Sequence, residues 1–158
     1  MKLLEIVVKD AILPDLEGKD RDAVIGELVD ALVEGGALAG ELRDEVLRSI
    51  IKREQRASTG FGHGVAVPHV KHPTIERPLV AIGISGQGID FNALDRQPVH
   101  SIFVLLSPED KPEDHLDAME AIFGNLSQDM FRRFLRQAKD TQAVLTLLAE
   151  ADAKASVP

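Results

Sequence analysis

The sequence contains no cysteine and no hydrophobic run long enough to cross a membrane. The lack of cysteine excludes disulfides, thiolate nucleophiles and cysteine metal sites. A membrane helix needs about 20 consecutive apolar residues. The N-terminus carries Glu5 in its apolar stretch and lacks the small-residue cleavage pattern of a signal peptide. These absences predict a cytoplasmic protein with no direct membrane insertion.

Positive charge is also in short supply. The chain has 18 Lys and Arg against 26 Asp and Glu, which gives a formal net charge of -8. Non-specific nucleic-acid binding depends on clustered basic side chains that neutralise phosphates. We therefore expect no nucleic-acid partner.

The chain has enough apolar residues for one folded core, since 44% of its 158 residues are hydrophobic. We expect one domain over residues 1–150. The polar, alanine-rich end "ADAKASVP" predicts a flexible tail over residues 151–158.

Apolar residues repeat at intervals of three and four in several segments, as expected for amphipathic helices. The pattern predicts helices over residues 20–35 and 41–55, and a later helix with Pro112 in its first turn. Two further helices are expected over residues 129–138 and 141–150.

Two short runs rich in β-branched residues, "LVAIGI" at residues 79–84 and "VHSIFVLL" at residues 99–106, predict buried strands. "GVAV", ahead of Pro68, predicts a third. Interspersed helices and strands predict a single α/β domain, with a mixed β-sheet flanked by helices on both faces.

A glycine-rich loop, "STGFGHGVAVPHVKHP", spans residues 58–73. Gly60, Gly62 and Gly64 give the spacing G-x-G-x-G between a helix and a strand, whereas a dinucleotide fingerprint needs G-x-G-x-x-G between a strand and a helix. No Gly-Lys-Ser/Thr follows, so a P-loop is excluded as well. The glycines indicate either a sharp turn or a nest of N–H groups that binds an anion.

The two residues before His69 restrict its backbone, which favours a fixed position for a reactive side chain. Pro68 has a fixed φ and holds Val67 extended, so the imidazole projects from a stiffened strand end. A neutral imidazole has one lone-pair nitrogen that can attack phosphorus when a partner holds the proton on the other nitrogen. Taken alone, His69 is also compatible with an ordinary surface histidine.

The other histidines could serve as metal ligands, as residues of the sheet or as part of a site. His63, His69 and His72 are spaced by six and three, which lacks the i, i+4 geometry of helical zinc motifs, so no metal site is expected. His100 is expected on a face of the sheet. His115 begins the helix after the last strand, where its side chain either points over the sheet edge toward a site or faces solvent.

These residues carry a resemblance to a known family. "REQRASTGFGHGVAVPH", residues 53–69, resembles the phosphorylation-site signature of enzyme IIA domains of the mannitol/fructose type in the bacterial phosphoenolpyruvate:sugar phosphotransferase system, including the nitrogen-regulatory members. "FNALDRQPV" and "HLDAMEAIF" resemble later segments of the same domains. The similarity extends over most of the chain, from about residue 4 to residue 150.

The resemblance implies a phosphotransferase component with a phosphohistidine intermediate. On it, His69 accepts a phosphoryl group from HPr or an HPr-like protein and passes it to a IIB domain, or holds it as a regulatory signal. His115 matches the second active-site histidine, and Arg53 matches the arginine ahead of the signature. No metal, nucleotide or other cofactor is implied.

The loop is expected to bind the phosphoryl group through Thr59, Gly60, Gly62 and Gly64. Each has a simpler reading: Thr59 as a turn cap and the glycines as turn residues. Arg53, by itself, is as well explained by a favourable interaction with the C-terminal end of its helix.

The chain departs from the family's usual pattern at four positions. His63 stands where asparagine is common, Val70 where a small residue is frequent, Asn92 where aspartate is usual and Arg96 where glycine is usual. One hypothesis is that His63 brings a third imidazole near the phosphoryl group.

Three functions are compatible with these residues. The first is a carrier that relays phosphoryl groups to a IIB domain, and the second is a regulatory protein whose phosphorylation state controls a partner. The third, a metal-dependent hydrolase that uses the histidine cluster, is disfavoured by the spacing of the histidines.

Overall fold

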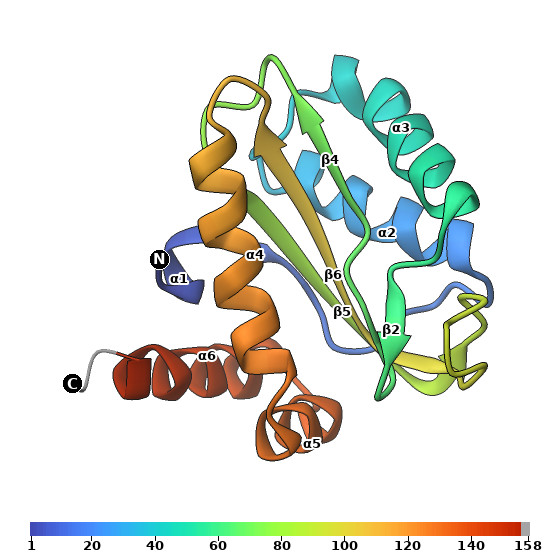
Figure 1. Cartoon of the computed structure of the whole chain (residues 1–158), viewed down its shortest axis with the longest axis vertical. Helices are drawn as coiled ribbons and strands as arrows, with labels where there is room; N and C mark the ends of the chain where they lie inside the picture. Colours follow the sequence, from blue (N-terminus) through green and yellow to red (C-terminus); the bar gives the residue numbers. More distant parts are fainter. Residues whose placement is uncertain (156–158) are drawn as a thin grey trace.

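The strands form one six-stranded sheet in the computed structural model, which describes residues 1–155 (Figure 1). The strands are β1 (Val7–Leu13), β2 (Gly60–Gly62), β3 (Val65–Ala66), β4 (His69–His72), β5 (Leu79–Ile89) and β6 (Val99–Pro108). The helices are α1 (Leu3–Ile6), α2 (Arg21–Glu34), the 3-10 turn η1 (Gly40–Leu42), α3 (Arg43–Arg56), α4 (Pro112–Leu126), α5 (Asp129–Gln137) and α6 (Thr141–Ala155).

The two predicted apolar runs are confirmed as the centre of the sheet. β5 and β6 pair antiparallel, with Leu79 opposite Leu106, and every residue of β6 is buried. β1 pairs parallel with the other edge of β5. β3 and then β4 pair parallel with β6, and β2 pairs antiparallel with β3. The sheet is therefore mixed, as expected.

Helices cover both faces of the sheet, which confirms the predicted architecture (Figure 1). α2 and α3 pack on the face that presents Ala81 and Val104. α4, α5 and α6 pack on the face that presents Ile82 and Phe103. Neighbouring residues of β5 and β6 alternate between the two cores because successive strand side chains point to opposite faces.

The predicted helices are confirmed within a few residues at each end, but β1 and α1 were not predicted. The strand β1 reads VVKDAIL, with exposed Lys9 and Asp10 in its middle. Its register against β5 shifts between Val7 and Ile12. An edge strand with such an irregularity does not show the alternating pattern by which strands are recognised.

The tail predicted over residues 151–158 does not begin at residue 151, because α6 continues through Ala155. The end of this helix is held by Asp152, which is only 6% exposed. Its carboxylate accepts hydrogen bonds from the backbone N–H groups of Leu3 (2.7 Å) and Leu4 (2.9 Å) at the start of α1. Residues 156–158 lie outside the described residues. Among residues 1–155, no helix combines the length and the apolar composition that a bilayer span needs.

Replacing Asp152 tests this tie between the two ends of the chain. Asp152→Ala leaves the buried N–H of Leu3 and the partly buried N–H of Leu4 without their acceptor, and we expect it to lower the free energy of unfolding by about 1–3 kcal/mol. The measurement is urea unfolding followed by circular dichroism. Glu150→Ala, an exposed position on the same helix, is the control and should change stability by less than about 0.5 kcal/mol. Equal effects of the two substitutions would contradict the assignment.

Candidate functional site

His69 is the first residue of β4, directly after the break that Pro68 makes between β3 and β4. Proline has no N–H to donate to a strand ladder. The carbonyl of Pro68 still accepts a hydrogen bond from the N–H of Leu105 (2.9 Å), and His69 itself pairs with Leu105 in register. The backbone of His69 is therefore fixed to β6, the buried strand of the sheet.

The side chain of His69 is held in one tautomer. Its Nδ1 lies 2.8 Å from the carbonyl oxygen of Val67. A carbonyl oxygen can only accept a hydrogen bond, so Nδ1 carries the proton and donates it, and Nε2 keeps its lone pair. The ring is half-buried. This is the arrangement that nucleophilic attack by Nε2 requires.

A second imidazole lies beside His69. The rings of His69 and His115 have centroids 5.7 Å apart and are tilted by 45°. His115 lies in the first turns of α4, and its Nδ1 is 2.7 Å from Oγ of Ser107 at the end of β6. His115 is 8% exposed and Ser107 is fully buried. The side chain of His115 therefore points over the sheet to His69 and not into solvent.

The surroundings of His115 favour its neutral form. Burial lowers the pKa of His115 below its ordinary value, and the positive charge of Lys71 and the neighbouring His69 lower it further. Lys71 lies two residues after His69 on β4, so the two side chains leave the same face of the strand.

Sequence reasoning missed both Lys71 and Ser107. The signal for Lys71 was its period-two spacing from His69. The signal for Ser107 was a polar residue at the end of an otherwise apolar strand.

Arg53 lies in the last turn of α3, a helix that packs against β4. Its Nη1 donates a hydrogen bond to the carbonyl of Ala57 (2.8 Å), just past the end of the helix. A cation at this end of a helix is favourable, and the contact matches the simpler reading of Arg53. Within residues 1–155, Arg53 makes no other hydrogen bond or ion pair. Its action on a phosphoryl group stays a prediction.

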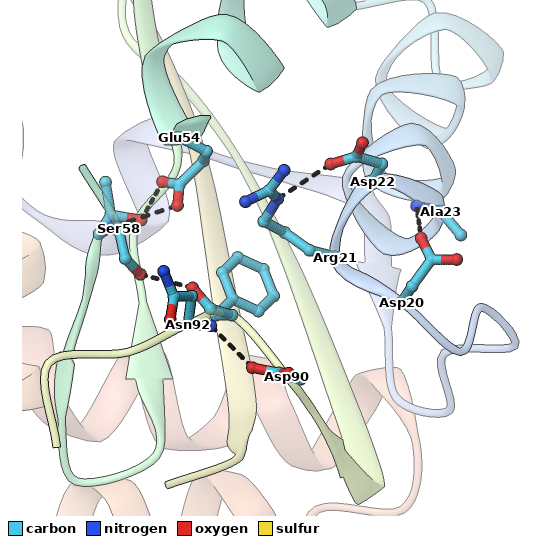
Figure 2. Close-up of polar contacts among 10 residues, drawn as sticks. Asp20, Arg21, Asp22, Ala23, Glu54, Ser58, Asp90 and Asn92 are labelled. Carbon is cyan, nitrogen blue, oxygen red and sulfur yellow. Dashed lines mark hydrogen bonds and ion pairs between the residues drawn. The ribbon is translucent and has the colours of Figure 1, made fainter. Parts of the chain in front are cut away.

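Thr59 is bound to a buried acid that the sequence did not reveal. Its N–H and Oγ1 both donate to the carboxylate of Glu54, which is 2% exposed. Figure 2 shows Glu54 reaching from α3 to the segment around Ser58. Oγ of Ser58 donates to the carbonyl of Phe91 (2.8 Å) and accepts from the N–H of Gly60 (2.9 Å). In this state the donors of Thr59 and Gly60 are engaged inside the protein.

Gly62 and Gly64 belong to a hairpin turn and not to a cradle beneath His69. Gly62 pairs with Val65, and the two residues between them, His63 and Gly64, both have positive φ (60° and 74°). Val65 lies beside Ser101 and His69 beside Leu105. Four residues of strand separate the turn from His69, which is about 13 Å at 3.3 Å per residue. Because the turn lies at the far end of β3, this geometry does not support binding of the phosphoryl group by Gly62 and Gly64, which stays a prediction.

The same geometry removes the hypothesis that His63 is a third imidazole at the site. His63 lies in this turn at a φ that favours asparagine or glycine, which explains why asparagine suits the position. Asn92 and Arg96 also have positive φ, 51° and 59°. A glycine would suit the position of Arg96 for the same reason. Nothing in the structure explains Val70.

The histidines do not gather around one point. His72 is bound by Glu45, 3.1 Å from its Nε2, and its Nδ1 accepts from the N–H of Thr74. His100 is a buried residue of β6, in the sheet as expected, and its Nδ1 lies 2.8 Å from the carbonyl of Ser85. Among residues 1–155, no group of three or more His, Cys, Asp or Glu is arranged to hold a metal ion.

The fold and the site together define an α/β domain with a tautomer-fixed histidine and a buried partner histidine at one end of a strand. Residues 5–151 match the family described as "Phosphoenolpyruvate-dependent sugar phosphotransferase system, EIIA 2". The match covers most of the chain, and the chain belongs to this family.

Curated relatives agree with this assignment. The chain is 35% identical over 130 residues to the "PTS system fructose-specific EIIA component" of Haloferax volcanii, covering 82% of this chain and 83% of the relative. It is 34% identical over 149 residues to a "Nitrogen regulatory protein" of Bradyrhizobium diazoefficiens, covering 94% and 95%. It is 32% identical to the fructose-specific EIIABC component of Bacillus subtilis, where 96% of this chain spans 24% of the longer relative.

Solved structures share the fold. Nitrogen Regulatory Protein IIA-Ntr from Neisseria meningitidis superimposes with a TM-score of 0.81 at 29% identity, covering 91% of this chain and 97% of that one. IIA mannitol from Escherichia coli superimposes with a TM-score of 0.74 at 18% identity, covering 88% and 96%. Both later segments that resembled the family lie within residues 5–151, which match the family.

The lowered pKa of His115 predicts how stability depends on pH. The unfolded chain protonates His115 near its ordinary pKa and the folded protein only at lower pH, so the folded state loses stability as pH falls below about 6.5. This residue contributes a slope of at most about 1.4 kcal/mol per pH unit. Urea unfolding between pH 5.5 and 7.5 measures it, with His115→Gln as the comparison. A slope that is the same in both proteins, or a proton NMR titration of His115 at or above its ordinary pKa, would contradict the assignment.

Proposed function

We propose that this protein is a phosphoryl carrier of the phosphotransferase system. In this function, Nε2 of His69 accepts a phosphoryl group from the phosphohistidine of HPr or an HPr-like protein and passes it to a IIB domain. The observation that carries the proposal is the bond from Nδ1 of His69 to the carbonyl of Val67, which in the neutral ring leaves the lone pair on Nε2, next to His115. The family and its fructose-specific and nitrogen-regulatory members support the same chemistry.

The transfer needs no general base. The lone pair of Nε2 forms the new N–P bond while the N–P bond of the donor breaks, and its electron pair returns to the donor nitrogen. Nδ1 of His69 keeps its proton throughout. The imidazole ring becomes more positive when it is phosphorylated, and the carbonyl dipole of Val67 stabilises that charge.

Groups around His69 are suited to the charge of the transferred group. Phosphoryl transfer depends mainly on positioning and on stabilising negative charge. The hydroxyl of fully buried Ser107 lies 2.7 Å from Nδ1 of His115. In the tautomer in which this hydroxyl donates to Nδ1, His115 presents an N–H from Nε2. Lys71 adds a positive charge. Arg53 and Thr59 act on the phosphoryl oxygens after exchanging their present contacts with Ala57 and Glu54.

A regulatory role uses the same site. The nitrogen regulatory protein of Bradyrhizobium diazoefficiens matches this chain over 95% of its own length, which favours a protein whose phosphorylation state at His69 controls a partner. Incubating the phosphorylated protein with a fructose-type IIB domain separates the two functions. A carrier transfers its phosphoryl group to the IIB domain during the incubation, whereas a regulator keeps it.

Phosphorylation of His69 is tested directly with phosphoenolpyruvate, enzyme I and HPr. The parent protein should gain one acid-labile phosphate, and His69→Ala should gain none because the attacking nitrogen is removed. His63→Ala, an exposed histidine in the distant turn, is the matched control and should be labelled like the parent. Label is measured by intact mass before and after acid treatment. A labelled His69→Ala protein would overturn the proposal.

The role of Arg53 has its own test. Arg53→Ala should leave the circular dichroism spectrum unchanged and slow phosphoryl transfer by about 10²-fold, because it removes charge stabilisation that matters only while phosphorus is present. Arg56→Ala, an exposed arginine in the same helical turn, is the control. Rapid-quench measurements of transfer from phospho-HPr give the rates. If both variants transfer at the parent rate, Arg53 serves only to cap its helix.

A further inference from the structure

A cavity of about 510 Å³ lies between α5 and the turn that joins β2 to β3. It is separate from the His69 site, since His69, His115 and Arg53 do not line it. Its polar lining consists of His63, His100, Ser101, Asp129, Arg132, Arg133, Arg136 and Gln137.

Positive charge dominates the lining. Three guanidinium groups, those of Arg132, Arg133 and Arg136, face one carboxylate, that of Asp129. Arg132 and Arg133 share this carboxylate, at 3.5 and 3.3 Å. Within residues 1–155, Arg136 has no hydrogen-bond or ion-pair partner. The cavity therefore holds two formal positive charges in excess.

The arginines are partly fixed in place. Nη1 of Arg132 donates to the carbonyl of Leu126 (2.7 Å), and the side chain of Arg132 is only 15% exposed. Arg132 and Arg136 are four residues apart on α5, so they lie on the same side of the helix. Like charges gathered in a concave surface repel one another unless an anion is bound between them.

His63 also lines this cavity. Its φ of 60° suits asparagine or glycine better, yet an imidazole is present and lines the cavity. The histidine that replaces the family's usual asparagine at position 63 therefore changes the lining of the arginine cavity and not the pair formed by His69 and His115.

We propose that this cavity binds a compact phosphorylated small molecule that carries at least two negative charges. Arginine guanidinium groups match phosphate oxygens in charge and in fork geometry. The volume falls within the range of about 300–1,000 Å³ typical of small-molecule sites. An extended polyanion such as a nucleic acid is disfavoured, because the whole chain carries a net charge of -8.

The test is a ¹H–¹⁵N NMR titration with inorganic pyrophosphate at about 0.1 M chloride, where long-range surface attraction is screened. We expect saturable shifts at the backbone amides of Gly64, Ser101 and Gln137, with a Kd below about 1 mM. The double variant Arg133→Gln/Arg136→Gln should weaken binding at least about tenfold by removing two charge-assisted contacts. Arg48→Gln, an exposed helical arginine outside the cavity, is the control and should keep the parent Kd.

The titration distinguishes binding in this cavity from binding at the His69 site. Shifts that centre on His69 and Val70, or that disappear in His69→Ala, would place the anion at the phosphorylation site and overturn the proposal. No saturation up to about 10 mM pyrophosphate, or equal Kd in the double variant and the parent, would overturn it too. Failure here leaves the phosphorylation of His69 untouched, because the two sites share no residue.

Discussion

The site depends on the pairing of two short strands, one after the other, with the same buried strand. β3 and β4 both run parallel to β6, and Pro68 stands between them while its carbonyl stays bonded to Leu105. The break frees the carbonyl of Val67 from the ladder, and this is the group that holds the proton of His69. Two residues beyond Leu105, Ser107 holds His115. One strand therefore sets the position of both imidazoles.

The resting site favours a neutral imidazole at His115. His69 donates from Nδ1 to a carbonyl, and His115 is kept neutral by burial and by nearby positive charge. When the phosphoryl group arrives, its negative charge favours the positive form of the bases around it. The group therefore partly offsets the lowering of the pKa of His115 that burial and nearby positive charge cause at rest.

The sequence predicted the parts of the molecule whose pattern is local. Helices α2 to α6 have clear periodicity, strands β5 and β6 are marked by continuous apolar runs, and the order helix, loop, strand around His69 was right. The sequence left the role of the glycines open because it depends on register: only the pairing of Gly62 with Val65 shows that they form a two-residue turn. Lys71 was missed because its partner His115 lies far away along the chain. Ser107 and Glu54 were missed because the turns that bring them to His115 and Thr59, eight and five residues away, do not show in a local pattern.

The bonds from Leu3 and Leu4 to Asp152 bring the first and last described helices together, and α1 and α6 both lie away from β4 in Figure 1. Such closeness of the ends makes the domain a good subject for circular permutation: a short linker can join them, and the chain can be reopened at an exposed loop.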